Sequence, residues 1–252
     1  MINSTWIDEY HLLIFNQIDS TNDEAKRLIS NGLGNDDCVI IADQQISGRG
    51  RRGKEWISDI GNLYCTILLC GDIKVNQAQQ LSFLSSIALY DAIVYLAQNR
   101  KITIDIKLKW PNDLLINGNK VSGILIESIK HNNQNYTLIG LGANLAKHPE
   151  IDQATTSLLK ENISINNFDM LDLFMHSFAK YLSIWQFAGF DQIKSYWMQR
   201  SYKLDTMLIV NDNVNNIAGA FCGIDDEGNL LLRKSDDNNV MVFNSAQVSL
   251  LV

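Results

Sequence analysis

The sequence is short of the residues that build metal centres and nucleic-acid-binding surfaces. Its four cysteines form no C-x-x-C pair and its four histidines are scattered, so we predict no protein-ligated metal. The net charge of -7 argues against a broadly basic face for DNA but allows one local basic patch. The N-terminus lacks the basic and apolar regions of a signal peptide, and no apolar run approaches the ~20 residues that span a bilayer. We therefore expect a cytoplasmic protein without a membrane partner.

Proline is rare as well, which leaves long regular elements uninterrupted. Only Pro111 and Pro149 occur among 252 residues, and 46% of the chain is hydrophobic, enough for a packed core. Strand-like segments at 12–18, 38–43 and 62–69 alternate with apolar residues at helical spacing over 77–98. The first strand leads into Ser20-Thr21-Asn22-Asp23-Glu24, a capping-box pattern that predicts a helix with Thr21 as its N-cap and a stop near Gly32.

After residue 103 the apolar residues alternate with polar ones, as in antiparallel strands. Segments 104–110, 113–116, 121–129 and 136–145 read as strands, with a two-residue hairpin turn at Asn117-Gly118. Helical spacing returns at 171–185 and 190–200. This pattern predicts an α+β fold in which helices pack on a mixed, largely antiparallel sheet.

The last fifty residues follow a different sequence pattern. After about Lys203, short strand-like stretches are separated by polar turns at 212–215, 225–229 and 235–239. Runs of this length and spacing are typical of a small SH3-like β-barrel. We therefore predict two domains, residues 1–202 and residues 203–252.

The strongest chemical signal is a glycine-rich basic loop at 48–54, with the sequence G-R-G-R-R-G-K. Four cations within seven residues of an acidic protein indicate an anionic ligand, and the glycines let the backbone approach that ligand closely. Arginine forks suit carboxylate and phosphate oxygens, and Trp56 just downstream offers a flat apolar face. The alternative is a solvated basic surface loop, because short basic runs are common.

Three further segments are informative mainly in combination. K-W-P-N-D at 109–113 would otherwise be an ordinary strand end and turn. In G-N-K-V-S-G-I-L-I-E at 118–127, Lys120 follows a tight turn and Gly123 interrupts a strand, which predicts close approach by a ligand or another backbone. The alternative is a charged strand start with a packing glycine. G-L-G-A-N at 140–144 lacks the strand-turn-helix context of a dinucleotide fingerprint, yet it ends a strand in a form that could line a nucleotide pocket.

Together these segments resemble the biotin–protein ligase family. The likeness is carried by S-T-N at 20–22, Q-x-x-G-R-G-R-R-G-K-x-W at 45–56 and the three segments above, in the family's order and spacing. It implies a class II synthetase-like ligase core that activates biotin with ATP as biotinyl-adenylate. Biotin would then pass to a lysine of biotin carboxyl carrier protein. Mg²⁺ would accompany ATP, held mainly by phosphates and water.

The resemblance also implies roles for individual residues, which we state as expectations. The expected catalytic residues are Lys120, Arg51 and Asp113, with Asp113 also a candidate to deprotonate the acceptor lysine. The expected biotin-binding residues are Ser20, Thr21, Asn22, Gln45, Arg49, Gly50, Arg51, Lys120 and Gly123. The expected ATP- or adenylate-binding residues are Arg49, Arg51, Arg52, Lys54, Trp56, Asn112, Asp113, Lys120 and Asn144.

Two departures from the family pattern affect these expectations. Lys54 stands where many members have arginine, which keeps the charge but loses the bidentate fork. The first strand of the ligase core is predicted near Leu12, which leaves no room for a helix-turn-helix, so we expect ligation without DNA binding. Family members often pair through sheet edges, and this resemblance allows a homodimer.

Other classes of protein remain as alternatives. A lipoate–protein ligase shares the fold class and the acyl-adenylate chemistry, but the G-R-G-R-R-G loop, K-W-P-N-D and G-x-K-x-S-G-I-L resemble the biotin branch. A nucleic-acid-binding module would need a broader basic face with aromatic platforms. A scaffold built around an SH3-like barrel would leave Lys120 and the arginine loop without a purpose.

Overall fold

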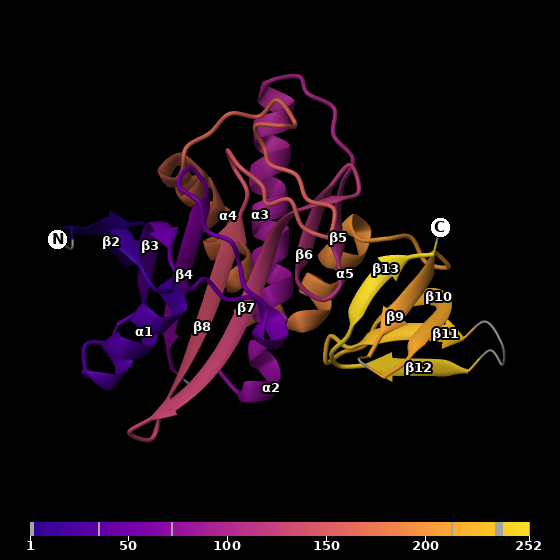
Figure 1. Ribbon diagram of the computed structural model, residues 1–252. Helices are drawn as coiled ribbons and strands as arrows, with labels where there is room; N and C mark the ends of the chain where they lie inside the picture. Colours follow the sequence, from indigo (N-terminus) through magenta and orange to yellow (C-terminus); the bar gives the residue numbers. More distant parts are fainter. Residues whose placement is uncertain (1–2, 35, 72, 213, 235–238, 252) are drawn as a thin grey trace.

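The computed structural model describes residues 3–34, 36–71, 73–212, 214–234 and 239–251 (Figure 1). Its main feature is an eight-stranded sheet with the strand order β1-β2-β3-β4-β8-β7-β6-β5. These strands are β1 (Asn3–Ile7), β2 (Tyr10–Ile18), β3 (Cys38–Gln45), β4 (Leu63–Cys70), β5 (Ile106–Lys109), β6 (Asp113–Ile116), β7 (Asn119–His131) and β8 (Gln134–Ala143). Of the described strand pairs in this sheet, β2 and β3 run parallel and the others antiparallel. The predicted mixed, largely antiparallel sheet is confirmed.

Helices cover both faces of this sheet because its central strands are apolar on both sides. On one face, Ala25 and Ile29 of α1 (Thr21–Ser30) pack in a cluster with Ile40, Leu68 and Leu138. The alternate residues of the same strands, such as Val39, Ile41 and Ile67, belong to the larger core on the opposite face. That core also contains residues of α3 (Gln80–Asn99), α4 (Asn167–Ala188) and α5 (Phe190–Arg200), and the short helix α2 (Val75–Ala78) precedes α3. Figure 1 shows α1 apart from the other helices.

Two local expectations can be compared with the backbone. The prediction of Thr21 as the N-cap of α1 is wrong: Ser20 is the cap residue, and Thr21 is the first residue of the helix. The reason is that the Thr21 hydroxyl and backbone N–H both donate to Gln45 Oε1, so the hydroxyl serves a tertiary contact. The predicted turn at Asn117-Gly118 is confirmed, since both residues adopt positive φ (50° and 79°).

Strand β1 was not predicted, because its five residues, N-S-T-W-I, show no clear alternation of apolar and polar side chains.

A second difference from the sequence analysis concerns hydropathy, since the stretch Asn76–Asn99 is long and apolar enough to span a membrane by length and composition. However, 72% of its most apolar window is buried inside the protein, and α3 packs in the core on the same face of the sheet as α4.

The C-terminal residues form a second, smaller sheet in the order β12-β11-β10-β9-β13. Its strands are β9 (Met207–Asn211), β10 (Asn216–Ile224), β11 (Leu230–Lys234), β12 (Val240–Phe243) and β13 (Gln247–Leu250). All its described pairs are antiparallel, but none joins β12 to β13, so the closed SH3-like barrel is not established. The predicted turn at 225–229 is present, with Asp225 accepting from Glu227 N and Asn229 N. The predicted turns at 212–215 and 235–239 include residues outside the described ones.

Candidate active site

A cavity of about 870 Å³ opens on the sheet face that carries α1. The strands β7 and β8 form its floor, the loop after β3 covers it, and residues of the C-terminal sheet complete one wall. The structure brings every sequence-predicted site residue to this one cavity. These residues are Ser20, Thr21, Asn22, Gln45, Arg49, Gly50, Arg51, Arg52, Lys54, Trp56, Asn112, Asp113, Lys120, Gly123 and Asn144.

The floor of the cavity is made of glycines from two neighbouring strands. Gly123 of β7 lies opposite Gly142 of β8, and the Trp56 ring rests on both: a Cβ at Gly142 would overlap the indole, and one at Gly123 would lie 3.0 Å from its Cζ3. A Cβ at Gly140 would overlap Asn22 Oδ1. At Gly123 and Gly142 the close approach is therefore made by the Trp56 side chain, and at Gly140 by the Asn22 side chain. The prediction of a ligand or another backbone at Gly123 stays a prediction. Trp56 Nε1 is buried without a partner among the described residues.

At one end of the cavity the lining residues Thr21, Asn22 and Gln45 belong to a network of neutral hydrogen-bonding groups. Thr21 donates to Gln45 Oε1 at 3.1 Å, and Gln45 Nε2 donates to Ser58 Oγ at 3.0 Å. The Thr66 hydroxyl lies 2.8 Å from Thr21 Oγ1 and 2.5 Å from Asn22 Oδ1. Such a set of fixed donors and acceptors, placed near an apolar floor, suits a compact ring with its own N–H and C=O groups.

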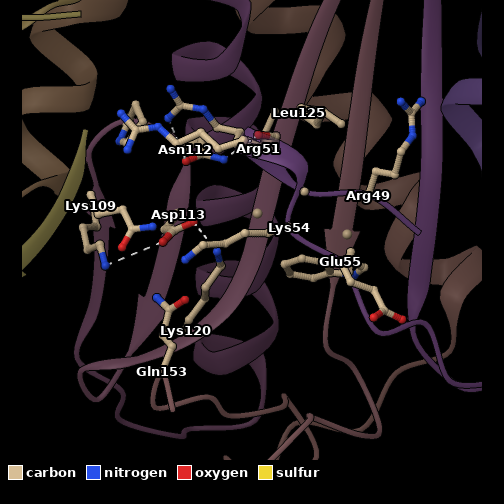
Figure 2. Close-up of a pocket in the computed structure, with 18 of the residues that line it drawn as sticks. Arg49, Arg51, Lys54, Glu55, Lys109, Asn112, Asp113, Lys120, Leu125 and Gln153 are labelled. Carbon is tan, nitrogen blue, oxygen red and sulfur yellow. Dashed lines mark hydrogen bonds and ion pairs between the residues drawn. The ribbon is translucent and has the colours of Figure 1, made fainter. Parts of the chain in front are cut away.

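A carboxylate anchors this polar end to the basic loop. Glu127 accepts from Asn22 Nδ2 at 2.7 Å and from Lys26 Nζ at 2.9 Å, and Arg49 lies 3.4 Å away. Burial alone would raise the pKa of Glu127, but the hydrogen bonds from Asn22 and Lys26 and the charge of Lys26 lower it. Arg49 also pairs with Asp23 at 2.5 Å, so its guanidinium points away from Lys109 and Lys120, which we call the lysine cluster, as Figure 2 shows.

The middle of the cavity holds a carboxylate between two ammonium groups. Asp113 Oδ1 lies 2.6 Å from Lys120 Nζ, and Oδ2 lies 3.6 Å from Lys109 Nζ (Figure 2). Burial would raise the pKa of Asp113, but Lys120 and Lys109 outweigh it, and the pKa is lowered. The Lys120 ammonium also lies 5.4 Å from the centroid of the Trp56 ring, which directs it over the glycine floor.

The segment between β12 and β13 contacts the basic loop through Ser245. Ser245 Oγ accepts from Arg51 Nη2 at 3.2 Å and from Arg52 Nη2 at 3.0 Å. Arg51 also donates to Asn112 Oδ1 at 3.4 Å, which joins the loop to the K-W-P-N-D segment. Burial, with the Arg52 charge alongside, lowers the pKa of Arg51. Arg52 itself has left-handed backbone (φ 56°), a strained conformation of the kind found at ligand sites.

The two asparagines predicted at the nucleotide end hold backbone segments. Asn112 Nδ2 donates to Ile124 O at 2.6 Å, and Asn144 Nδ2 donates to Thr156 O at 3.0 Å. Asn144 thereby fixes the segment that carries Gln153 and Thr155 along the cavity wall. These contacts set the shape of the pocket.

Several residues at the site were not identified from the sequence alone: Thr66, Ser58, Glu127, Lys109 and Ser245. Lys109 and Glu127 lie inside the quoted segments, and their position was the available signal. Thr66 sits in the apolar run of β4, where a buried hydroxyl gives no pattern of its own. Ser245 is an isolated serine whose contact depends on how the second sheet packs.

Within the described residues no group of three or more His, Cys, Asp or Glu side chains is placed to hold a metal. Among the cavity carboxylates, Asp113 is already engaged by two lysines. The cavity therefore combines cations from the basic loop and the lysine cluster with a neutral polar end. That arrangement can bind a polar ring and bring an anionic tail beside phosphates.

The sequence and the fold are similar to those of known proteins. The family model for the biotin/lipoate A/B protein ligases matches residues 14–144. A biotin--[acetyl-CoA-carboxylase] ligase of Paracoccus denitrificans is 34% identical over 85% of this chain and 91% of its own. The chain belongs to the biotin/lipoate A/B protein ligase family. The matched region contains the whole basic loop, the lysine cluster and the glycine floor.

Two further members of this ligase family extend the likeness. The bifunctional ligase/repressor BirA of Bacillus subtilis strain 168 is 30% identical over 90% of this chain and 70% of its own length. A solved biotin protein ligase from Aquifex aeolicus, in complex with biotin and ATP, superposes with a TM-score of 0.78 over 95% of this chain and 99% of that one, at 24% identity. That structural likeness extends the shared fold to the C-terminal sheet.

Proposed function

We propose that this protein is a biotin–protein ligase: it activates biotin with ATP as biotinyl-5′-adenylate, releases pyrophosphate, and transfers biotin to a lysine of a carrier protein. The main evidence is that five segments far apart in the sequence meet at one cavity. Its neutral polar end suits the ureido ring of biotin, and its cationic middle suits the carboxylate. The named activity of the Paracoccus denitrificans relative supports this assignment.

At the ring end, the ureido group of biotin binds among Ser20, Thr21, Asn22 and Gln45. Gln45 and Thr21 already form a rigid polar pair at 2.9 Å through the Thr21 N–H. The sulfur-containing ring lies beside Gly123, against the Trp56 indole that covers the glycine floor. The resulting pocket places the valerate carboxylate toward the Lys120 ammonium.

In the first half-reaction a biotin carboxylate oxygen attacks the α-phosphorus of ATP, and the bond to the bridging oxygen breaks as pyrophosphate leaves. Both reactants are anions, so their repulsion must be offset before the new bond can form. Lys120 lies between the floor and Asp113 and is suited to contact both reacting groups. Arg51, Arg52 and Lys54 supply further positive charge around the phosphates, and Arg49 does so only if it leaves Asp23 and Glu127.

In the second half-reaction the amine of the acceptor lysine attacks the acyl carbon of the mixed anhydride, and AMP leaves. Asp113 is the carboxylate nearest to Lys120, and its lowered pKa keeps it ionised as a proton acceptor for that amine. Gly50, Asn112, Trp56 and Asn144 shape the pocket around the nucleotide. Closure of the basic loop would exclude water from the reactive anhydride.

Five features of this proposal rest on the family likeness. Mg²⁺ accompanies ATP through phosphate and water ligands. The acceptor is a biotin carboxyl carrier protein, and the reaction takes place in the cytoplasm. The five C-terminal strands close as an SH3-like barrel over residues 203–252, beside a catalytic domain at 1–202. Two copies pair through a sheet edge, which sedimentation velocity would test.

The test of function is biotin-dependent release of pyrophosphate from ATP by the purified protein, with lipoate run in parallel. Release with biotin alone supports the proposal. Release with lipoate alone would reassign the chain to the lipoate branch of the family. Release with neither substrate would contradict the adenylation chemistry.

A further inference from the structure

Lys109 is a cavity residue for which the proposed mechanism has no use. Its ammonium group lies 3.6 Å from Asp113 Oδ2, on the opposite oxygen from the one that Lys120 contacts at 2.6 Å. Its side chain is only 14% exposed. A lysine held this far from water, next to a second lysine, needs a compensating role because desolvation and repulsion both disfavour its charge.

The charges of this cluster explain what a second lysine contributes. Asp113 alone with Lys120 would form a neutral pair, and the carboxylate would cancel much of the attraction that Lys120 exerts on an approaching anion. With Lys109 included, one carboxylate is shared by two ammonium groups. Burial lowers the pKa of Lys109 and the Asp113 charge opposes that shift, so with both lysines charged the cluster carries a net charge of about +1. The Lys120 ammonium has three donors, so it can keep Asp113 and still bind substrate oxygens.

The remaining groups around Asp113 do not replace this function. Lys54 and Arg51 add positive potential from the loop that covers the cavity, while Tyr202 approaches from the segment after α5 as a neutral phenol, because burial and the charge of Asp113 raise its pKa to about 12. Among these described neighbours, Lys109 and Lys120 are the two cations in ion-pair distance of the carboxylate.

We propose that Lys109 is a positioning residue for Lys120: by sharing the Asp113 carboxylate, it leaves the charge of the Lys120 ammonium group available to the anionic end of the substrate. The inference rests on the proposed function, because it names biotin carboxylate as that anion. It assigns Lys109 no contact with the reacting atoms.

The experiment compares binding of biotin with binding of its alcohol, in which CH₂OH replaces the carboxylate. Lys109→Met keeps the volume of the side chain and removes the charge. We expect it to raise the Kd for biotin about tenfold, the size of a Coulombic effect in a partly buried site, and to leave the Kd for the alcohol within about twofold. Lys109→Arg, which restores the charge, should bind biotin within about threefold of the unsubstituted protein.

Lys107→Met is the matched control. Lys107 lies two residues away on β5, pairs with Asp105 at 2.8 Å and is absent from the cavity lining, so its removal should change neither Kd. Equal loss of both ligands in Lys109→Met would mean a structural role, and unchanged biotin binding would mean no role; either result overturns the inference. Failure of the unsubstituted protein to bind biotin would overturn the proposed function itself, which is a separate result.

Discussion

Gly140→Ala tests whether the glycine floor exists to admit the Asn22 side chain. A Cβ at position 140 would overlap Asn22 Oδ1 and would lie 3.1 Å from its Cγ, so the amide must withdraw. Withdrawal breaks the 2.7 Å hydrogen bond to Glu127 and the 2.5 Å contact with the Thr66 hydroxyl. Only glycine at 140 lets Asn22 occupy its present place.

The size of the effect follows from these two contacts. A hydrogen bond to a charged group contributes about 1.5–3 kcal/mol, and one between neutral groups contributes about 1 kcal/mol. Alanine also reduces the conformational entropy of the unfolded chain, which stabilises the folded state by roughly 0.4–1 kcal/mol. We therefore expect Gly140→Ala to lower the free energy of unfolding by about 2–3 kcal/mol and to weaken biotin binding, because Asn22 no longer faces the ring site.

A double-mutant cycle isolates the cause. Asn22→Ala removes the side chain that the new Cβ meets, so the double variant Asn22→Ala/Gly140→Ala should be about as stable as Asn22→Ala alone. Urea unfolding gives the four free energies, and titration with biotin gives the four affinities. If the two single effects add to within about 0.5 kcal/mol, the overlap with Asn22 is not what makes glycine necessary at 140.

Three further perturbations probe other parts of the molecule. Lys120→Ala should lose most biotin-dependent pyrophosphate release while its unfolding curve stays cooperative; near-normal release would remove Lys120 from the chemistry. Ser245→Ala should speed dissociation of biotinyl-adenylate several-fold, since both loop arginines lose a shared acceptor; unchanged retention would mean that the C-terminal sheet does not hold the loop. Asp19→Asn should destabilise the protein at pH 7, and that difference should shrink as pH falls below 3.8 toward 2, because the hydrogen bond from Arg27 lowers the pKa of Asp19 to about 2 and the folded-state advantage exists only while Asp19 is ionised. A pH-independent difference would contradict that linkage.

Patterns with a short range in the chain predicted most of the fold. Helical spacing predicted 190–200, which is the extent of α5. The Asn-Gly turn set the first pairs of β6 with β7, Ile116 with Asn119 and Leu115 with Lys120, before the register shifts at a bulge. The parallel pairing of β2 with β3 could not be predicted in this way, because it depends on α1 packing back against the sheet after crossing it. The predicted closure of the small sheet into a barrel is not confirmed, because no described pair joins β12 to β13 at its two ends.

For the candidate site, too, local features were predictable from the sequence and long-range contacts were not. Residue type and motif spacing indicated which side chains would surround a ligand, since clustered glycines and cations are visible as motifs in the local sequence. The partner that orients each of them is remote: Asn22 meets Glu127 across 105 positions of the chain, and Arg51 meets Ser245 across 194. Such contacts depend on the packing of whole elements rather than on any local preference. Arg49 illustrates the consequence, because its charge and loop suggested a phosphate ligand, whereas the fold supplies it with Asp23 and Glu127 as anionic partners. In this structure its charge is therefore bound within the protein, and a phosphate at the loop would have to compete with two carboxylates for it.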